Sequence, residues 1–138
     1  MKKEIFTICD SAESYGDKLI IVGPFTHIHL NALPATHPGF SVVARLRYDK
    51  GGTVQKEMTL RIAGPDGKEV IEPVTIPLNL PPREDDLAVF NLKLSVSQLK
   101  FDIPGEYRIT LDGDDLSEEL SFFVIDQSRQ SQHSPSIP

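Results

Sequence analysis

An all-β domain is the fold class that the sequence predicts, and three observations predict it. Eleven prolines are spread along the 138 residues, and between Pro24 and Pro104 only segments 39–64 and 83–103 could hold a long helix. Both segments instead alternate apolar and polar residues with a period of two, as strands with one wet face do. Turn-forming residues recur roughly every 8–12 residues, which is typical of a sandwich or barrel. We therefore expect a β-sandwich of about eight or nine strands.

The two alternating segments each define a face that should point into the core. In segment 39–64 the apolar face consists of Phe40, Val42, Ala44, Leu46 and Tyr48, with Ser41, Arg45 and Arg47 opposite. In segment 83–103 it consists of Phe90, Leu92, Leu94 and Val96, with Asn91, Lys93, Ser95 and Ser97 opposite. Because side chains two residues apart leave a strand on the same side, each segment predicts one strand with a buried face.

The N-terminal part of the chain predicts two further strands. The first lies near Glu4–Cys9, and the turn Ser14–Asp17 follows it. A long second strand is expected from Lys18 to Leu30. Gly23-Pro24 interrupts it, so either a bulge or a crossing between sheets is expected there.

The middle of the chain predicts a strand, a tight turn and an edge strand. Thr53–Ile62 places Met58, Leu60 and Ile62 on its inward face. The turn Gly64–Gly67 should lead into a return strand near Lys68–Ile71. Val74–Leu80 alternates as well, and its prolines predict an edge strand because proline cannot donate to a second neighbour.

The C-terminal part predicts a hairpin and a tail. One strand turns Tyr107, Ile109 and Leu111 inward, the acidic loop 112–115 reverses the chain, and Leu120, Phe122 and Val124 return. Gln127–Pro138 is polar with almost nothing to bury, so we expect a disordered tail after a single domain of residues 1–126.

Charge and composition exclude several classes of protein. The formal net charge of −6 argues against nucleic-acid binding, which needs a basic face. The longest apolar runs, 19–22 and 122–125, are far shorter than the roughly 20 residues of a membrane span. Lys2-Lys3 is followed by no apolar signal-peptide region, and the single Cys9 cannot form an internal disulfide. We therefore expect a cytoplasmic protein that contacts neither nucleic acid nor membrane.

Two stretches resemble known domains. Segment 99–107, which ends Pro104-Gly105-Glu106-Tyr107, is similar to the closing hairpin of bacterial immunoglobulin-like domains. That similarity implies an immunoglobulin-like Greek-key sandwich, in which the hydroxyl of Tyr107 bonds back to the backbone at a tyrosine corner. Segment 9–23, together with segment 60–68, resembles an uncharacterised bacterial β-sandwich family of unknown function, over about residues 4–125. This resemblance implies a fold but supplies no catalytic residues.

Three histidines are the candidate metal ligands. His27 and His29 are two residues apart on one strand, so both imidazoles should leave the same face. His37, in the following proline-rich loop, could be a third ligand. The alternative is that all three are ordinary surface residues beside a loop, because no cysteine or acidic partner stands at ligand spacing.

The other candidate groups each have a simpler alternative. Cys9-Asp10-Ser11 could form a catalytic thiol site if a histidine lay beside it, but Cys9 also fits a small core position. The acidic clusters 84–86 and 112–115 could bind Ca²⁺ or form solvated turns. Arg45, Arg47 and Arg61 could hold an anionic partner or cover a solvated face.

The sequence leaves the function unknown, and we expect no enzyme and no cofactor because no catalytic or cofactor motif is present. The leading hypothesis is a non-enzymatic protein-interaction module that binds an unidentified protein through an edge strand or end loops. Self-association through edge strands is a further option. The alternative is a small-molecule- or metal-binding β-sandwich domain that uses the histidines and acidic loops.

Overall fold

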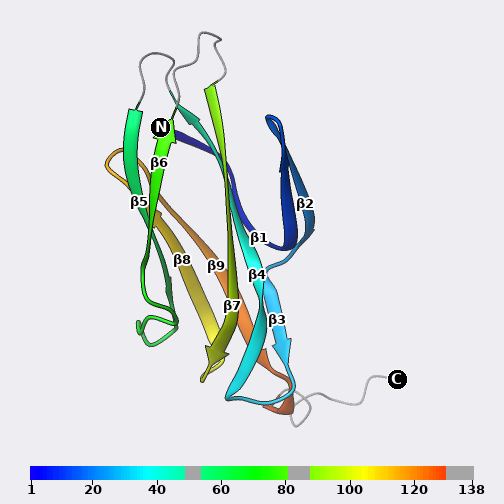
Figure 1. The fold of residues 1–138 in the computed structure, drawn as a ribbon. Coiled ribbons are helices and arrows are strands. Elements are labelled where there is room, and N and C mark those ends of the chain that lie inside the picture. The colour runs from blue at the N-terminus through cyan, green and yellow to red at the C-terminus, as the bar shows by residue number, and fades with distance from the viewer. Residues whose placement is uncertain (49–53, 81–87, 130–138) are drawn as a thin grey trace.

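The computed structural model describes residues 1–48, 54–80 and 88–129, and these residues form nine strands in two sheets. The four-stranded sheet has the order β2-β1-β4-β7, and the five-stranded sheet has the order β3-β9-β8-β5-β6 (Figure 1). The strands are β1 (Lys2–Tyr15), β2 (Lys18–Pro24), β3 (His27–Leu30), β4 (Ala35–Tyr48), β5 (Val54–Ala63), β6 (Val74–Leu80), β7 (Ala88–Phe101), β8 (Gly105–Asp112) and β9 (Ser117–Asp126). The all-β prediction is confirmed.

The chain passes from one sheet to the other at Gly23-Pro24. Strand β2 ends at Pro24 in the four-stranded sheet, and β3 begins at His27 in the five-stranded sheet. Gly23 has φ +66°, a left-handed conformation that glycine adopts without a steric penalty. Of the two sequence-based alternatives for this site, the crossing is correct. Strand β3 then pairs with β9 in parallel, whereas the other ladders are antiparallel.

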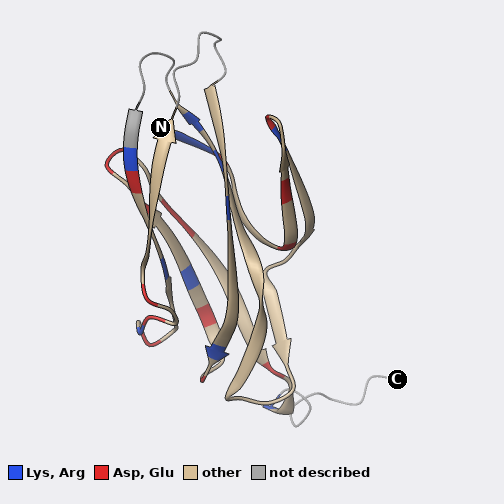
Figure 2. Cartoon of the chain, viewed as in Figure 1, with Lys and Arg blue, Asp and Glu red and all other residues tan. Residues whose placement is uncertain are grey.

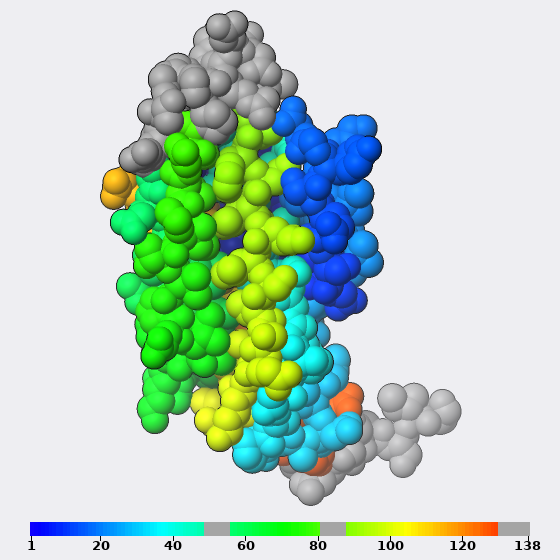
Figure 3. All heavy atoms as spheres, viewed as in Figure 1, coloured from blue at the N-terminus to red at the C-terminus, as the bar shows by residue number. Residues whose placement is uncertain are grey.

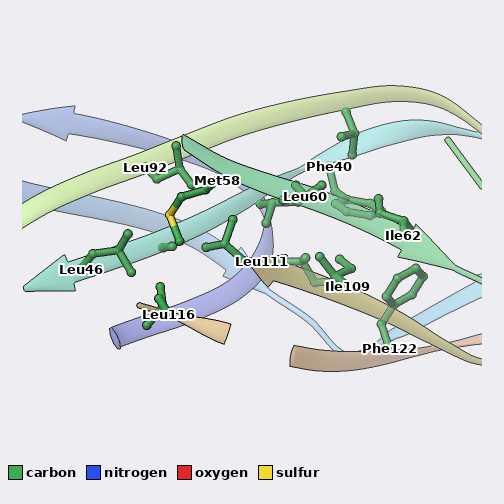
Figure 4. Packing of buried hydrophobic residues seen from close by; sticks show 14 of the residues in the cluster. Phe40, Leu46, Met58, Leu60, Ile62, Leu92, Ile109, Leu111, Leu116 and Phe122 are labelled. Carbon is green, nitrogen blue, oxygen red and sulfur yellow. The ribbon is translucent and has the colours of Figure 1, made fainter. Parts of the chain in front are cut away.

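The core lies between the two sheets and is filled by the inward faces that the alternation predicts (Figure 4). Phe40, Val42, Ala44 and Leu46 of β4 are buried, as are Met58, Leu60 and Ile62 of β5. The inward residues of β8 and β9 meet them from the opposite sheet: Tyr107, Ile109, Leu111, Phe122 and Val124. The hydrophobic effect on these faces therefore fixes the two-layer arrangement.

Strands β4 and β7 change their buried face part-way along the ladder. Phe40 faces Val96 and both are buried, but beyond them Leu99 and Phe101 are the buried residues of β7. At the change, Gln98 has φ 55° and Gly39 has φ +135°. A Cβ atom on Gly39 would lie 2.2 Å from the carbonyl oxygen of Val96, so only glycine fits this position.

The predicted tyrosine corner is present. The Tyr107 hydroxyl donates a hydrogen bond of 2.6 Å to the carbonyl oxygen of Ile103, and the side chain is buried. Its ring packs against Phe101 at 5.0 Å and Phe122 at 5.4 Å between ring centroids. Gly105, with φ +133°, lets the preceding turn pass close to Pro65. The corner thus ties the start of β8 to the aromatic part of the core.

One expectation for the middle of the chain is wrong. The return strand near Lys68–Ile71 is only a turn with one isolated bridge, between Ala63 and Glu69. Pro73 has no N–H group to continue the ladder, and regular pairing with β5 starts at Val74. The edge position of β6 is nevertheless correct, because β5 is the one strand it pairs with in the described part of the chain.

The end of the chain is described only as far as Arg129. Gln127–Arg129 form one helical turn, and the Asp126 carboxylate caps it by accepting hydrogen bonds from the backbone N–H and the hydroxyl of Ser128. The predicted disorder of residues 130–138 concerns a segment outside the described residues. Within the described ranges, no helix is long and apolar enough to cross a membrane.

Candidate functional site

The β1–β2 hairpin folds back over the outer face of the four-stranded sheet. Strand β1 pairs with β4 only up to Cys9, whereas Ser11–Tyr15 pair with Lys18–Val22 of β2. Figure 1 shows this distal part, which we call the hairpin (residues 11–22), turning back beside the sheet. In Figure 3 it forms a ridge along one side of the molecule.

A second, smaller apolar cluster holds the hairpin on the sheet. Cys9, Ala12 and Val43 are fully or almost fully buried, and Leu19 and Ile21 pack against them. Val43 lies on the face of β4 opposite to the main core, since it alternates with the core residues Val42 and Ala44. The sequence-based expectation of a wet outer face on β4 is therefore wrong at this position, because the hairpin covers it.

The tip of the hairpin is anchored by polar contacts. The carbonyl oxygen of Asp17 accepts hydrogen bonds from Arg45 Nη1 at 2.7 Å and from Asn91 Nδ2 at 3.2 Å. Arg45 Nη1 also donates to Asn91 Oδ1 at 3.0 Å, and its Nε lies 3.5 Å from a carboxylate oxygen of Glu4. Arg45 thus serves the fold by fixing the hairpin against β4 and β7.

The outward face of the hairpin carries exposed apolar side chains beside two charged ones, because Glu13 pairs with Ile20 and Lys18 pairs with Tyr15 on the same face. Of the five large apolar side chains that are strongly exposed among the described residues, three lie here: Tyr15 (76% exposed), Ile20 (52%) and Val22 (53%). Strand β2 is also an edge strand, with β1 as its one neighbour in the described sheet. The middle of β2, Leu19–Val22, carries no charge (Figure 2) and no proline, whereas Lys18 begins the strand and Pro24 ends it. Only the middle of this edge therefore lacks the features that usually block pairing with another chain.

His27 and His29 leave the same face of β3, as the sequence predicts. Both are exposed, and their ring centroids are 6.4 Å apart with an angle of 21° between the ring planes. The ring of His27 also stacks on Phe123 of β9, with 5.3 Å between centroids. Thr26 Oγ1 lies 2.8 Å from Nδ1 of His27. The three rings form a short exposed row at the β3 edge of the five-stranded sheet.

His37 does not join this pair. It lies on β4, where its Nδ1 accepts a hydrogen bond of 2.9 Å from the backbone N–H of Gly39. Its ring lies near Phe40 and Phe101, and burial lowers its pKa. Across residues 1–48, 54–80 and 88–129, no three His, Cys, Asp or Glu side chains converge as metal ligands would. The proposed role of His37 as a third ligand therefore has no support in this geometry.

The thiol of Cys9 is a buried group. Burial raises its pKa, and the nearby charge of Asp10 raises it further. The thiol also donates to the carbonyl oxygen of Ser11 at 3.2 Å. A nucleophilic cysteine needs the opposite environment, one that lowers the pKa of the thiol and leaves it accessible. Cys9 is accordingly a packing residue beneath the hairpin.

The acidic loop 112–115 is occupied by contacts within the chain. The carboxylate of Asp115 forms ion pairs with Lys56 and with the amino group of Met1, and Asp112 accepts a hydrogen bond of 2.6 Å from the hydroxyl of Ser117. Such contacts compete with Ca²⁺, which prefers six to eight oxygen ligands. The other acidic cluster, residues 84–86, lies outside the described residues.

The three arginines do not form one group. Arg45 and Arg47 of β4 share Glu4, which lies 3.0 Å from Nε of Arg47. Arg61 belongs to β5 in the other sheet and pairs with Glu69 at 3.1 Å. The three arginines therefore do not share one face that could hold an anionic partner, because β4 and β5 are consecutive strands in different sheets.

A hollow of about 640 Å³ lies over β5 and β6. It is lined by Lys56, Glu57, Pro77, Leu78, Asn79 and Asp114. Among the described residues that line it there is neither an aromatic ring nor a histidine or cysteine, and Lys56 is already paired with Asp115. Pockets for small molecules are usually lined by apolar and aromatic groups, so this hollow gives little support to small-molecule binding.

Comparison with known protein families assigns the chain to one of them. Residues 4–125 match the family of unknown function DUF6941. The chain belongs to this family. DUF6941 has no known function, and the matched range contains the whole hairpin and both sheets except the first two residues of β1 and the last residue of β9. No curated protein matches the sequence.

Solved structures share the fold of this DUF6941 chain but little of its sequence. One is a beta-glucosidase from Listeria innocua in complex with isofagomine, with a TM-score of 0.50, 10% identity, and coverage of 88% of this chain and 16% of that chain. The same enzyme in complex with glucose gives a TM-score of 0.50 and 10% identity, over 80% of this chain and 19% of that chain. The likeness concerns the fold alone, because the sequence identity is 10% and because the match spans less than a fifth of the enzyme.

Proposed function

We propose that this protein is a non-enzymatic interaction domain that binds another protein through the hairpin. The observation that carries the proposal is the joint exposure of Tyr15 of β1 with Ile20 and Val22 of β2, together with the edge position of β2 in the described sheet. Exposed apolar patches on soluble domains commonly mark sites of protein contact. An extended segment of the partner would add to the edge of β2 through main-chain hydrogen bonds, while Ile20 and Val22 pack against its side chains.

The arrangement of strands supports an immunoglobulin-like Greek-key relationship as part of this proposal. Strands β1, β4 and β7 would correspond to strands A, B and E of such domains, and β5, β8 and β9 to strands C, F and G. The tyrosine corner at Tyr107 near the start of β8 supports the same correspondence. Domains with this layout serve many unrelated functions, so the site and not the fold carries the functional argument.

A cytoplasmic location is the remaining part of the proposal. Its support is that the sequence contains a single cysteine, Cys9, so the chain cannot form an internal disulfide.

Affinity capture with surface variants tests the interaction. The double variant Ile20→Lys/Val22→Lys places two charges on the apolar face, and both positions are more than half exposed, so it should fold. The matched control is Ser95→Lys/Ser97→Lys, which also introduces two lysines, at exposed positions of β7, the other edge strand of that sheet. Proteins captured from the native cells by wild type and by the control, but absent with the hairpin variant, would identify the partner.

Two other outcomes would revise the proposal. Equal capture by all three proteins would show that the hairpin is not the binding site. A wild-type dimer in size-exclusion chromatography with light scattering, converted to a monomer only by Ile20→Lys/Val22→Lys, would show that the edge pairs with a second copy of the chain.

A further inference from the structure

The His27–His29 pair has the residue types and the placement of a small chelating site. The two imidazoles project from the outward face of β3, an edge strand of four residues, and both are exposed. Neutral imidazole is a good ligand for Zn²⁺, Cu²⁺ and Ni²⁺. Because alternate residues on a strand leave the same face, both rings are available to one ion without any movement of the backbone.

The two rings are close enough to reach a shared ion after one of them turns. A metal–nitrogen bond is about 2.0–2.1 Å, and a ring nitrogen lies about 1.2 Å from the centre of its ring, so two rings on one ion have centres about 5 to 6.5 Å apart as the angle at the metal opens from tetrahedral to linear. The observed separation of the ring centroids, 6.4 Å, lies at the linear end of this range, and the rings are stacked. A tetrahedral ion therefore requires the exposed side chain of His29 to rotate and bring its ring closer to His27.

Thr26 supplies the outer contact that metal-binding histidines usually have. Its hydroxyl oxygen is 2.8 Å from Nδ1 of His27. In the tautomer with the proton on Nδ1, this nitrogen donates to Thr26 and Nε2 presents its lone pair outward. Such a hydrogen bond holds the ring in the metal-binding tautomer and orients it. Phe123, stacked on the other side of His27, further limits the orientations of the ring.

We propose that His27 and His29 bind one divalent transition-metal ion, with Nε2 of His27 as one ligand and solvent completing the coordination. The site is independent of the hairpin, which lies on the other sheet. His37 is not part of it, since its Nδ1 is bonded to the backbone of Gly39 and no third described ligand converges on the pair. With two protein ligands, the ion is exchangeable, in contrast to a four-ligand structural zinc site.

Titration of the untagged, full-length protein with ZnCl₂ tests the site. Isothermal titration calorimetry at pH 7.5 should give one ion per chain, and His27→Ala and His29→Ala should each weaken binding at least tenfold. Thr26→Val keeps the shape of the side chain and the backbone bond from Phe123 N–H to the Thr26 carbonyl oxygen, but removes the hydroxyl. It should weaken binding about tenfold, as loss of an outer-shell contact does.

Two histidine variants are the controls. His37→Ala and His133→Ala each remove a histidine outside the pair and should leave the affinity unchanged. Absence of binding at millimolar ZnCl₂, retention of binding in His27→Ala, or its loss in His133→Ala would each overturn the proposal.

Discussion

Replacing Tyr107 by phenylalanine should measure how much the tyrosine corner contributes to stability. The substitution removes only the hydroxyl, which donates 2.6 Å to the carbonyl oxygen of Ile103. Tyr107 is 2% exposed, but the acceptor that is left behind belongs to Ile103, which is 38% exposed, so water can partly replace the lost hydrogen bond. A fully buried unsatisfied acceptor costs about 1–3 kcal/mol, so for Tyr107→Phe we expect a loss of unfolding free energy at the low end, about 1 kcal/mol.

The truncation Tyr107→Ala should cost more, because it also opens a cavity. The ring lies between Phe101 and Phe122, with centroid distances of 5.0 and 5.4 Å. Removal of a buried aromatic ring costs about 3–5 kcal/mol. Urea unfolding followed by circular dichroism at 222 nm, with a common slope for all variants, measures both values. Tyr15→Phe, at a position that is 76% exposed, is the matched control and should change stability by less than about 0.5 kcal/mol.

The alkaline limb of stability provides a second measurement on the same residue. Burial raises the pKa of Tyr107 above its ordinary value of 10.0. The unfolded chain therefore loses this proton first, so the contribution of Tyr107 is complete below about pH 10 and is lost as the pH rises toward the higher folded-state value. The urea midpoint of wild type should fall more steeply above pH 10 than that of Tyr107→Phe. Equal small effects at Tyr107 and Tyr15, together with parallel pH curves, would refute the role assigned to the corner.

Three further predictions test other parts of the structure. Gly39→Ala should destabilise the fold by at least about 2 kcal/mol in urea unfolding, because the φ of this residue is +135° and a Cβ would collide with the backbone of Val96. The control Gly16→Ala, where φ is +61° and the space around the residue is open, should cost only about 1 kcal/mol. The thiol of Cys9 should react with Ellman's reagent far more slowly in the native protein than in urea, because burial and the Asp10 charge raise its pKa; equal rates would show that the hairpin leaves it open. The hydrogen bond from Lys56 lowers the pKa of Asp115, so the contribution of Asp115 to the free energy of unfolding is present above the ordinary value of 3.8 and is lost as the pH falls below it. In Asp115→Asn the free energy of unfolding should therefore fall less steeply below pH 4 than in wild type.

Several structural features follow from short-range patterns in the sequence. Alternation alone identifies the buried faces of β4, β5 and β8, because a strand with one wet face must bury every second residue. Pro104-Gly105 followed by Tyr107 predicts the corner, since the turn, the glycine and the buried hydroxyl are all within a few residues of one another. The sequence likewise predicts the break at Gly23-Pro24, but it does not distinguish a bulge from a crossing between sheets.

The two candidate sites differ in how far the sequence predicts them. The shared face of His27 and His29 follows from their spacing of two, and the structure adds the stacking on Phe123 and the contact with Thr26. The hairpin surface could not be assigned from the sequence, because Leu19–Val22 is apolar on both faces and its pattern does not say which face is covered. A cue was available in Val43, an apolar residue on the otherwise polar side of β4.

The sequence by itself therefore determined where strands form, which faces of most strands are buried and where the chain turns, since these depend on backbone sterics and on contact with water within a few residues. Only the tertiary structure decided that β3 separates from β2 and pairs in parallel with β9, that β4 and β5 lie in different sheets, and that the hairpin folds back over Val43. These choices are made between segments far apart in the chain. Their energies depend on which surfaces meet, and no local pattern of residues records the identity of a distant partner.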